Sequence, residues 1–407
     1  MSPVAVRPLC TAEQGAEIIT ALGEAQRSLQ VFDPDVCAFS AELSRRLRAS
    51  SRRQDSPAIA ALAYWIRPAN LARLRADWDR TVAIDRAEIV PRGTVFHLPP
   101  TNVDTLFVYS WLLSALMGNA NVIRIAPDAV EASGRLLAMV ADTLSGFPRV
   151  AASTALVSYG HDDDLTASLS QAEVRVIWGG DETVRSIRSL PVNPLASEIA
   201  FPNRFSLAVI DARSVLALPA ADVADLAQRF FNDAYWFDQL GCASPRAVVW
   251  RGDEPTVAEA AEVFFDAVEV ELDCRHYRVP DGAAMAKLVH LVGRAADGEL
   301  VSAKWGDGRL SVGWLEGDRP VPRDGPGAGL FYTGRIDELK ELIEIVQPVD
   351  QTLSYFGFDE DELRVLARSL GARGIDRVVA IGNALNFDRF WDGNDLLRSF
   401  TRFVSVE

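Results

Sequence analysis

The chain has 407 residues, of which 49% are hydrophobic and 24% are charged. This is an ordinary globular composition, and the length allows two or three domains with buried cores. The formal net charge of -15 at pH 7 argues against a nucleic-acid partner, which needs a basic surface, and against attraction to anionic lipid. Any anionic ligand therefore needs a locally positive site.

Targeting and metal signals are absent from the sequence. No apolar run approaches the roughly 18 to 20 residues of a membrane-spanning helix, and the first residues (MSPVAVRPLC) lack the order of a secretory signal. We expect no membrane span and a cytoplasmic location. The cysteines Cys10, Cys37, Cys242 and Cys274 form no C-x-x-C pair, and the four histidines are scattered, so we expect reduced thiols and no metal site.

The predicted elements begin with helices and continue as an α/β pattern. Apolar residues recur at helical spacing at Ile18–Leu22, Leu43–Leu47 and Ile59–Leu74. From residue 94, short apolar runs alternate with longer amphipathic ones, which is typical of a parallel sheet. The strand candidates are Thr94–Leu98, Asn121–Ile125, Ala155–Ser158, Val174–Trp178, Ser206–Ile210 and Ala247–Trp250. Helices between them are expected near Val103, Asp128, Asp163, Asp181 and Ala220.

The segment from Asp253 to Pro322 has a less regular pattern. Its candidate strands are Val268–Leu272 and Leu310–Leu315. Pro320–Gly329 (PVPRDGPGAG) is predicted to be a long loop, for which a functional role and simple mobility both stay open.

Cys242 follows a predicted amphipathic helix that starts near Ala220 and is expected to end at Gly241. Ser244 and Pro245 prevent the helix from continuing, so the thiol lies between a helix and the strand at Ala247. Most free cysteines are small buried hydrophobic residues, and the negative end of a helix dipole disfavours a thiolate. Local pattern alone therefore leaves a structural role open.

The string around this cysteine (DQLGCASPR, residues 238–246) resembles the nucleophile segment of the aldehyde dehydrogenase superfamily. With the preceding Asn232 and Asp233 it is most similar to the LuxC family of fatty-acyl-CoA reductases, and the resemblance extends from about residue 88 onward. It implies an α/β, aldehyde-dehydrogenase-like fold with two Rossmann-like parallel-sheet domains. The expected domains are a cofactor domain with a helical N-terminal region at 1–205, a catalytic domain at 206–388 and an oligomerisation strand at 389–407.

Further segments resemble the superfamily in the same order. HLPPTNVDTL places Asn102 as an oxyanion donor, although an asparagine that caps the next helix is an equally good local reading. GNANVIRIAP places Arg124 at the adenosine ribose or its 2′-phosphate, which favours NADPH and leaves NADH as an alternative; a surface ion pair is the structural alternative. VIWGGDETVR places Gly179, Gly180 and Thr183 at the pyrophosphate, where two glycines alone indicate only a turn.

Near the C-terminus, EIVQPVDQTL resembles the segment whose glutamate holds the nicotinamide ribose, which makes Glu344 a cofactor residue. A solvated helix-face carboxylate fits the same spacing. Phe400–Val404 resembles a terminal strand that joins a partner's sheet, so a homodimer or homotetramer is implied.

One departure from the superfamily bears on the reaction. Acid-forming members carry a glutamate upstream of the cysteine that activates water, and alignment places Phe201 there. Phenylalanine cannot act as a general base, although a shifted alignment would bring in Glu198.

The resemblance implies that NADPH-dependent reduction converts an acyl thioester, a fatty or similar apolar acyl-CoA, to an aldehyde through a covalent thioester on Cys242. The alternatives are reductive release of a carrier-protein-bound acyl or peptidyl thioester, acid-forming aldehyde oxidation, reduction of an acyl phosphate, and a non-catalytic homologue. An acyl-transferring enzyme is a candidate partner.

Overall fold

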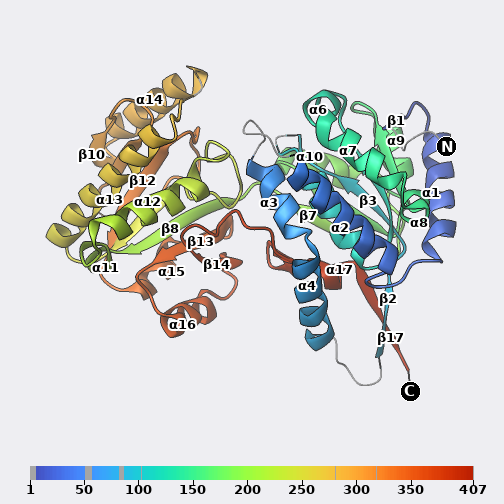
Figure 1. Ribbon diagram of the computed structural model, residues 1–407. Coiled ribbons are helices and arrows are strands. Elements are labelled where there is room, and N and C mark those ends of the chain that lie inside the picture. Colours follow the sequence, from blue (N-terminus) through green and yellow to red (C-terminus); the bar gives the residue numbers. More distant parts are fainter. Residues whose placement is uncertain are drawn as a thin grey trace. The chain divides into compact units, whose positions relative to one another are not determined.

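The structure, a computed structural model, describes residues 6–50, 57–81, 87–101, 103–279, 281–317 and 319–406. The chain divides into two compact units (Figure 1). Unit 1 comprises Met1–Pro202 and Phe387–Glu407, and unit 2 comprises Asn203–Asn386. Unit 1 is therefore discontinuous in sequence.

Unit 1 contains a six-stranded sheet in the order β1-β5-β4-β3-β6-β7, whose neighbouring strands are all parallel. The strands of the unit are β1 (Arg7–Pro8), β2 (Ala87–Pro91), β3 (Thr94–Leu98), β4 (Ala120–Arg124), β5 (Thr154–Ser158), β6 (Val174–Trp178), β7 (Ser197–Phe201), β15 (Phe390–Trp391), β16 (Asn394–Asp395) and β17 (Thr401–Ser405). The helices are α1 (Ala12–Gln26), α2 (Pro34–Ala49), α3 (Pro57–Trp65), α4 (Pro68–Thr81), α5 (Leu106–Leu116), α6 (Pro127–Ala132), α7 (Gly134–Leu144), α8 (Pro148–Ala152), α9 (Asp163–Leu169), α10 (Asp181–Ser189) and α17 (Leu396–Ser399).

Helices cover both faces of this sheet, which explains why its strands are continuous apolar runs. In β3, Val95 packs into the core that includes side chains of α2, α4 and α5. The next residue, Phe96, points to the opposite face and packs with Leu22 of α1 and Leu165 of α9. Alternation along each strand thus supplies two separate cores.

Unit 2 contains a seven-stranded sheet in the order β10-β11-β12-β9-β8-β13-β14, in which only the edge strand β10 is antiparallel to its neighbour. Its strands are β8 (Phe205–Asp211), β9 (Ala247–Arg251), β10 (Leu300–Lys304), β11 (Ser311–Leu315), β12 (Leu330–Ile336), β13 (Asp350–Phe356) and β14 (Arg377–Ala380). Its helices are α11 (Ala212–Leu216), α12 (Ala220–Ala234), α13 (Glu254–Cys274), α14 (Asp281–Ala296), the 3-10 helix η1 (Leu339–Glu341), α15 (Leu342–Ile345) and α16 (Glu360–Leu370).

This second sheet also has a core on each face. Trp250 of β9 packs with Phe230 of α12 and Phe264 of α13 on one face. Val249, the preceding residue, packs on the other face with Leu291 of α14 and Leu366 of α16. Both units are consequently doubly wound α/β layers.

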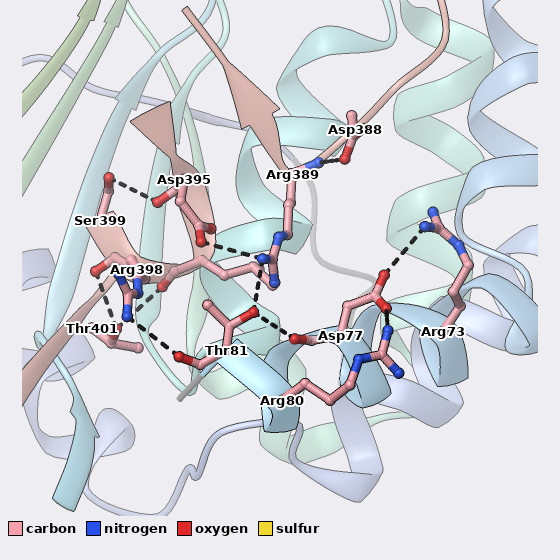
Figure 2. Close-up of polar contacts among 11 residues, drawn as sticks. Arg73, Asp77, Arg80, Thr81, Asp388, Arg389, Asp395, Arg398, Ser399 and Thr401 are labelled. Atoms are coloured by element: carbon pink, nitrogen blue, oxygen red, sulfur yellow. Dashed lines mark hydrogen bonds and ion pairs between the residues drawn. The ribbon is translucent and has the colours of Figure 1, made fainter. Parts of the chain in front are cut away.

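The C-terminal segment belongs to unit 1 and is held there by polar contacts (Figure 2). Arg389 Nη2 donates to Thr81 Oγ1 at 3.0 Å, and Asn119 Nδ2 donates to the Phe400 carbonyl at 3.0 Å. The last strand, β17, pairs antiparallel with β2 from Thr401 opposite Pro91 onward. Figure 1 shows this two-stranded ribbon projecting from the rest of unit 1.

Several predicted elements agree with the structure and three do not. The strands at Thr94–Leu98 and Val174–Trp178 are β3 and β6 to the residue. The strand predicted at Val268–Leu272 is wrong, because these residues lie in α13, where Val268 and Leu272 continue a buried stripe at helical spacing. The predicted helix at Ile59–Leu74 is in fact two helices, α3 and α4, and α4 begins at Pro68.

The helix before Cys242 was also predicted too long. It ends at Ala234 rather than at Gly241, and turns fill the interval. Within the described residues, none of the helices combines the length and apolarity needed to cross a bilayer.

Candidate active site

The turn that carries Cys242 connects α12 to β9 and begins with an unusual backbone. Asp238 and Gln239 both have left-handed φ angles, 49° and 60°. Non-glycine residues in this region cost roughly 1–2 kcal/mol each, so neighbouring contacts must stabilise them. One such contact is the Gln239 N–H, which donates to the Ala234 carbonyl at 2.9 Å and closes the end of α12.

The side chain of Gln239 is fully buried and makes three hydrogen bonds. Nε2 donates to the carbonyls of Pro245 and Leu330, each at 3.1 Å. Oε1 accepts from the Gly329 N–H at 2.6 Å. Since every polar atom of the amide is used, Gln239 joins both sides of the Cys242 turn to the start of β12.

Cys242 itself is exposed, whereas its backbone is fixed. Its carbonyl accepts from Ser206 Oγ at 2.7 Å, and the Arg246 N–H donates to the Ser206 carbonyl at 2.9 Å. The thiol is thus presented at the surface of unit 2 by a turn that is bonded to β8, which suits a nucleophile better than a core residue.

Arg246 supplies positive charge beside the thiol. Its Nε donates to the Gln239 carbonyl at 3.1 Å. Burial lowers the pKa of Arg246, and the charge of a Cys242 thiolate opposes that shift. The interaction is reciprocal, so the guanidinium favours the ionised thiol. The helix dipole does not oppose this effect, because α12 ends at Ala234, eight residues before Cys242. Arg246 is part of the DQLGCASPR string, but the sequence did not reveal that its charge favours the Cys242 thiolate.

Asp233 is a second residue of the family string whose role the sequence did not reveal. It is buried in α12, where its carboxylate accepts from the N–H groups of Gly382 at 2.7 Å and Ala384 at 2.9 Å. Burial raises the pKa of Asp233 to about 7, although these two donors lower it. Asp233 thereby anchors the 382–384 turn to the helix that precedes the Cys242 turn.

The strand order of unit 1 reverses at one point, where a nucleotide could bind. The chain proceeds from β3 to β4 and β5 on one side and then returns to β6 on the other, so the carboxyl ends of β3 and β6 flank a switch point. Open α/β sheets bind ligands at such points. Gly179 and Gly180 follow β6 directly, and Gly180 is the N-cap of α10.

The residues at this switch point fit a pyrophosphate. A Cβ on Gly179 would lie 3.0 Å from Thr183 Cγ2, so glycine keeps the turn close to α10. The N-terminus of α10 is the positive end of the helix dipole, which favours negative charge. Asp181 and Glu182, whose charges were left unexplained by the sequence, lie in the first helical turn, where carboxylates stabilise a helix.

Arg124 lies at the carboxyl end of β4 in the same sheet. Its Nη2 donates to the carbonyls of Tyr159 at 3.2 Å and Gly160 at 3.1 Å, and its guanidinium lies over the Tyr159 ring at 5.0 Å. Because these partners are neutral, the positive charge of Arg124 is not cancelled by them. A phosphate group is a suitable ligand for such a guanidinium.

The two residues considered for the general-base position are both unsuited to that role. Phe201 is buried and stacks on Trp178 with ring centroids 3.7 Å apart. Glu198 forms ion pairs with Arg175 and Arg188, each at 2.6 Å. Burial alone would raise the pKa of Glu198, but these two arginines outweigh it and hold the pKa below the usual value. A carboxylate so engaged is a poor proton acceptor.

The remaining predicted site residues are less well defined. Glu344 lies in α15 of unit 2, is exposed, and forms an ion pair of 3.5 Å with Arg373. Asn102 lies outside the described residues. Among the residues that the structure does describe, no three His, Cys, Asp or Glu side chains are arranged to hold a metal ion.

A cavity of about 330 Å³ in unit 1 contains none of the predicted site residues (Figure 2). Its wall includes Arg73, Asp77, Arg80 and Arg389. Asp77 pairs with both Arg73 and Arg80, and Arg389 pairs with Asp395. Much of the positive charge is therefore neutralised within the protein.

Comparison with solved structures defines the class of protein. Glyceraldehyde-3-phosphate dehydrogenase GapN from Methanocaldococcus jannaschii, complexed with NADP, has a TM-score of 0.68 at 12% identity, over 100% of this chain and 98% of that one. A variant of 1-pyrroline-5-carboxylate dehydrogenase from Thermus thermophilus has a TM-score of 0.67 at 14% identity, over 98% and 86%. Lactaldehyde dehydrogenase from Escherichia coli has a TM-score of 0.64 at 14% identity, over 100% and 94%. The chain has the aldehyde dehydrogenase fold, and the predicted fold class is confirmed.

The family follows from the sequence. The model of the acyl-CoA reductase (LuxC) family matches residues 73–403, and the chain belongs to this family, as the DQLGCASPR string predicted. A search of curated proteins gives no match. Family and fold together support an oxidoreductase that reduces an acyl group to an aldehyde.

Proposed function

We propose that the protein reduces a fatty or similarly apolar acyl-CoA to the aldehyde with NADPH, through a covalent thioester on Cys242. The observation that carries this proposal is the exposed Cys242 beside Arg246, in a turn fixed by Gln239 and Ser206. Family membership supports the reaction class. Unit 2 then serves as the catalytic domain and unit 1 as the cofactor domain.

The first half of the reaction uses side chains of this protein. The Cys242 thiolate forms a bond to the thioester carbonyl carbon, the bond from that carbon to the CoA sulfur breaks, and CoA leaves as a thiolate. Arg246 favours the ionised form of the attacking sulfur. In this proposal Asn102 donates to the oxyanion, a contribution typically of about 3 kcal/mol. The acyl group is then held on Cys242.

Cofactor binding falls to unit 1 and to Glu344. Gly179, Gly180 and Thr183 hold the pyrophosphate at the N-terminus of α10, and Arg124 recognises the 2′-phosphate. Glu344 holds the nicotinamide ribose. When bound, the cofactor would supply a hydride to the acyl carbon; the bond from that carbon to the Cys242 sulfur would then break, which releases the aldehyde and restores the thiolate. The NADP complex of the structurally similar GapN supports this choice.

The two residues considered for the general-base position favour reduction over hydrolysis. Phe201 is apolar and Glu198 is engaged by two arginines, so neither activates water. An acyl group on Cys242 is therefore long-lived enough to be reduced.

Intact mass spectrometry tests the proposal. Wild-type protein mixed with an acyl-CoA and no cofactor is expected to gain the mass of one acyl group. Cys242→Ala is expected to gain none, while Cys274→Ala, which removes another exposed thiol, is expected to behave as wild type. An adduct that persists in Cys242→Ala contradicts the proposal. Cofactor oxidation with NADPH and NADH in parallel, over acyl-CoAs of increasing chain length, tests the cofactor and the substrate.

A second copy of the chain is the proposed partner at β17. Phe403 and Val404 are large apolar residues in this strand, 45% and 36% exposed, and within the described residues β17 pairs with β2 alone. An unpaired edge with exposed apolar side chains favours addition to another sheet. Light scattering of wild type and of a variant with Phe403→Glu tests this assembly, and an unchanged mass contradicts it.

A further inference from the structure

Lys287 is a fully buried lysine that the proposed reaction does not use. It lies in α14 with 0% of its surface exposed. The chain has only three lysines, Lys287, Lys304 and Lys340, among its 41 basic residues. Lys304 and Lys340 pair with carboxylates at the surface, whereas no ion pair links Lys287 to a carboxylate in the described part of the chain. A buried ammonium is costly, so its hydrogen bonds need an explanation.

Both partners of Lys287 are backbone carbonyls in loops that flank β11. Nζ donates to the carbonyl of Ala328 at 2.7 Å and to that of Gly308. The ammonium also lies 5.9 Å from the centre of the Trp305 ring. Burial lowers the pKa of Lys287 to about 8, although the nearby Asp307 raises it. The contacts of Lys287 therefore serve loop conformation rather than charge pairing.

The loop segment that Lys287 holds is strained. Gly327, Ala328 and Gly329 are consecutive residues with left-handed φ angles of 73°, 52° and 85°. Ala328 is the costly member, because a side chain disfavours this region by roughly 1–2 kcal/mol. The segment ends the Pro320–Gly329 loop, for which the sequence left function and mobility open.

This strained segment docks directly on the start of the Cys242 turn. The Ala328 N–H donates to the Asp238 carbonyl at 2.8 Å, and the Gly329 N–H donates to Gln239 Oε1 at 2.6 Å. A Cβ on Gly327 would lie 2.7 Å from the Asp238 carbonyl oxygen. Two left-handed segments thus fit closely together, and their conformations depend on each other.

We propose that Lys287 is a positioning residue for the nucleophile: by binding the Ala328 carbonyl it holds the Gly327–Gly329 segment against Asp238 and Gln239 and so sets the place of Cys242 beside Arg246. The path consists of hydrogen bonds from Lys287 to Ala328, from Gly329 to Gln239, and from Gln239 to Pro245. The catalytic meaning of this role rests on the function proposed above.

Thiol alkylation tests the role without relying on turnover. Lys287→Met keeps the length of the side chain and removes its N–H donors, and Lys340→Met, at an exposed lysine, is the matched control. Iodoacetamide modification of each cysteine is followed by peptide mass spectrometry from pH 6 to 10. Cys10 and Cys274 are exposed thiols in the same molecule and serve as internal standards.

The expected result is selective for Cys242. In Lys287→Met its alkylation at pH 7 falls about tenfold, which corresponds to a rise of about one unit in the midpoint of its pH profile. Cys10 and Cys274 keep their rates, as does every cysteine of Lys340→Met. Lys287→Gln, which retains two N–H donors, recovers part of the Cys242 rate, and kcat for acyl-CoA reduction follows the same order.

Two results overturn the inference: an unchanged Cys242 profile in folded Lys287→Met, or an equal change at all three cysteines. If Lys287→Met does not fold, Gly327→Ala provides a second test, because the added Cβ pushes the Gly327–Gly329 segment away from Asp238. The same selective loss of Cys242 alkylation is expected. Failure of the proposed function gives a different result, since a wild-type protein that does not reduce acyl-CoA still yields the alkylation profiles.

Discussion

Replacement of Gln239 by methionine is expected to weaken the centre of unit 2. Methionine keeps the length of the side chain but leaves three buried groups without partners: the Pro245 and Leu330 carbonyls and the Gly329 N–H. Each buried unsatisfied group costs about 1–3 kcal/mol, so the total is about 3–9 kcal/mol. This is a large part of the ~5–15 kcal/mol that stabilises a typical domain.

Native-state hydrogen exchange measures this loss locally. The amides of β9 and β12, which the Gln239 bonds adjoin, are expected to open with a free energy at least about 3 kcal/mol smaller in Gln239→Met. Gln347→Met is the matched control, because Gln347 is exposed in the same unit. If the two variants exchange at equal rates in β9 and β12, the three bonds do not stabilise the turn as inferred.

Three further predictions concern charge. The folded pKa of Asp233 is about 7, above the ordinary value near 4, so the folded state binds the extra proton and stability falls as pH rises from about 4 to 7, by at most about 4 kcal/mol. Calorimetry at several pH values is expected to show this slope, and a similar slope in Asp233→Asn contradicts it. Burial lowers the pKa of His97 to about 4, so here the unfolded state binds the proton and stability is lost as pH falls from about 6.5 to 4, by at most about 3 kcal/mol. In calorimetry, His97→Gln is expected to lose less stability than the wild type between pH 6.5 and 4. Arg246→Gln is expected to slow Cys242 alkylation at pH 7 about tenfold, since the cation no longer favours the thiolate; an unchanged rate, with surface Arg364→Gln as the control, refutes this role.

Much of the fold was predictable from the sequence because strands buried in a parallel sheet have short, largely apolar sequences. The runs at Thr94–Leu98 and Val174–Trp178 have no competing helical pattern, and both are strands. Val268–Leu272 (VEVEL) alternates apolar and charged residues as a half-buried strand does, yet it lies in a 21-residue helix. A short β-branched run fits either structure until its flanking residues are considered, which is why that prediction was wrong.

The candidate site also contains some residues that the sequence could predict and others that it could not. Cys242 and its string were identifiable because a family resemblance is carried by local sequence, and Gly179 with Gly180 follows a strand that the sequence had located. The contribution of Lys287 was not predictable, because its partners Gly308 and Ala328 are far from it in sequence and are backbone atoms. The only available signal was that one of the three lysines of this arginine-rich chain lies within an apolar helical stretch.

The discontinuity of unit 1 has a consequence for biosynthesis. Its C-terminal segment makes contacts that complete the unit, including the hydrogen bond from Arg389 to Thr81 and the pairing of β17 with β2. A ribosome must first synthesise residues 203–386, which takes about 10 to 40 s at typical elongation rates. Throughout that interval β2 lacks its partner strand, and at its end unit 2 has every residue it needs while unit 1 still lacks residues 387–407. Unit 2 is therefore expected to complete its folding before unit 1, and nascent chains arrested after residue 386 should show a protected Cys242 turn alongside an unpaired β2.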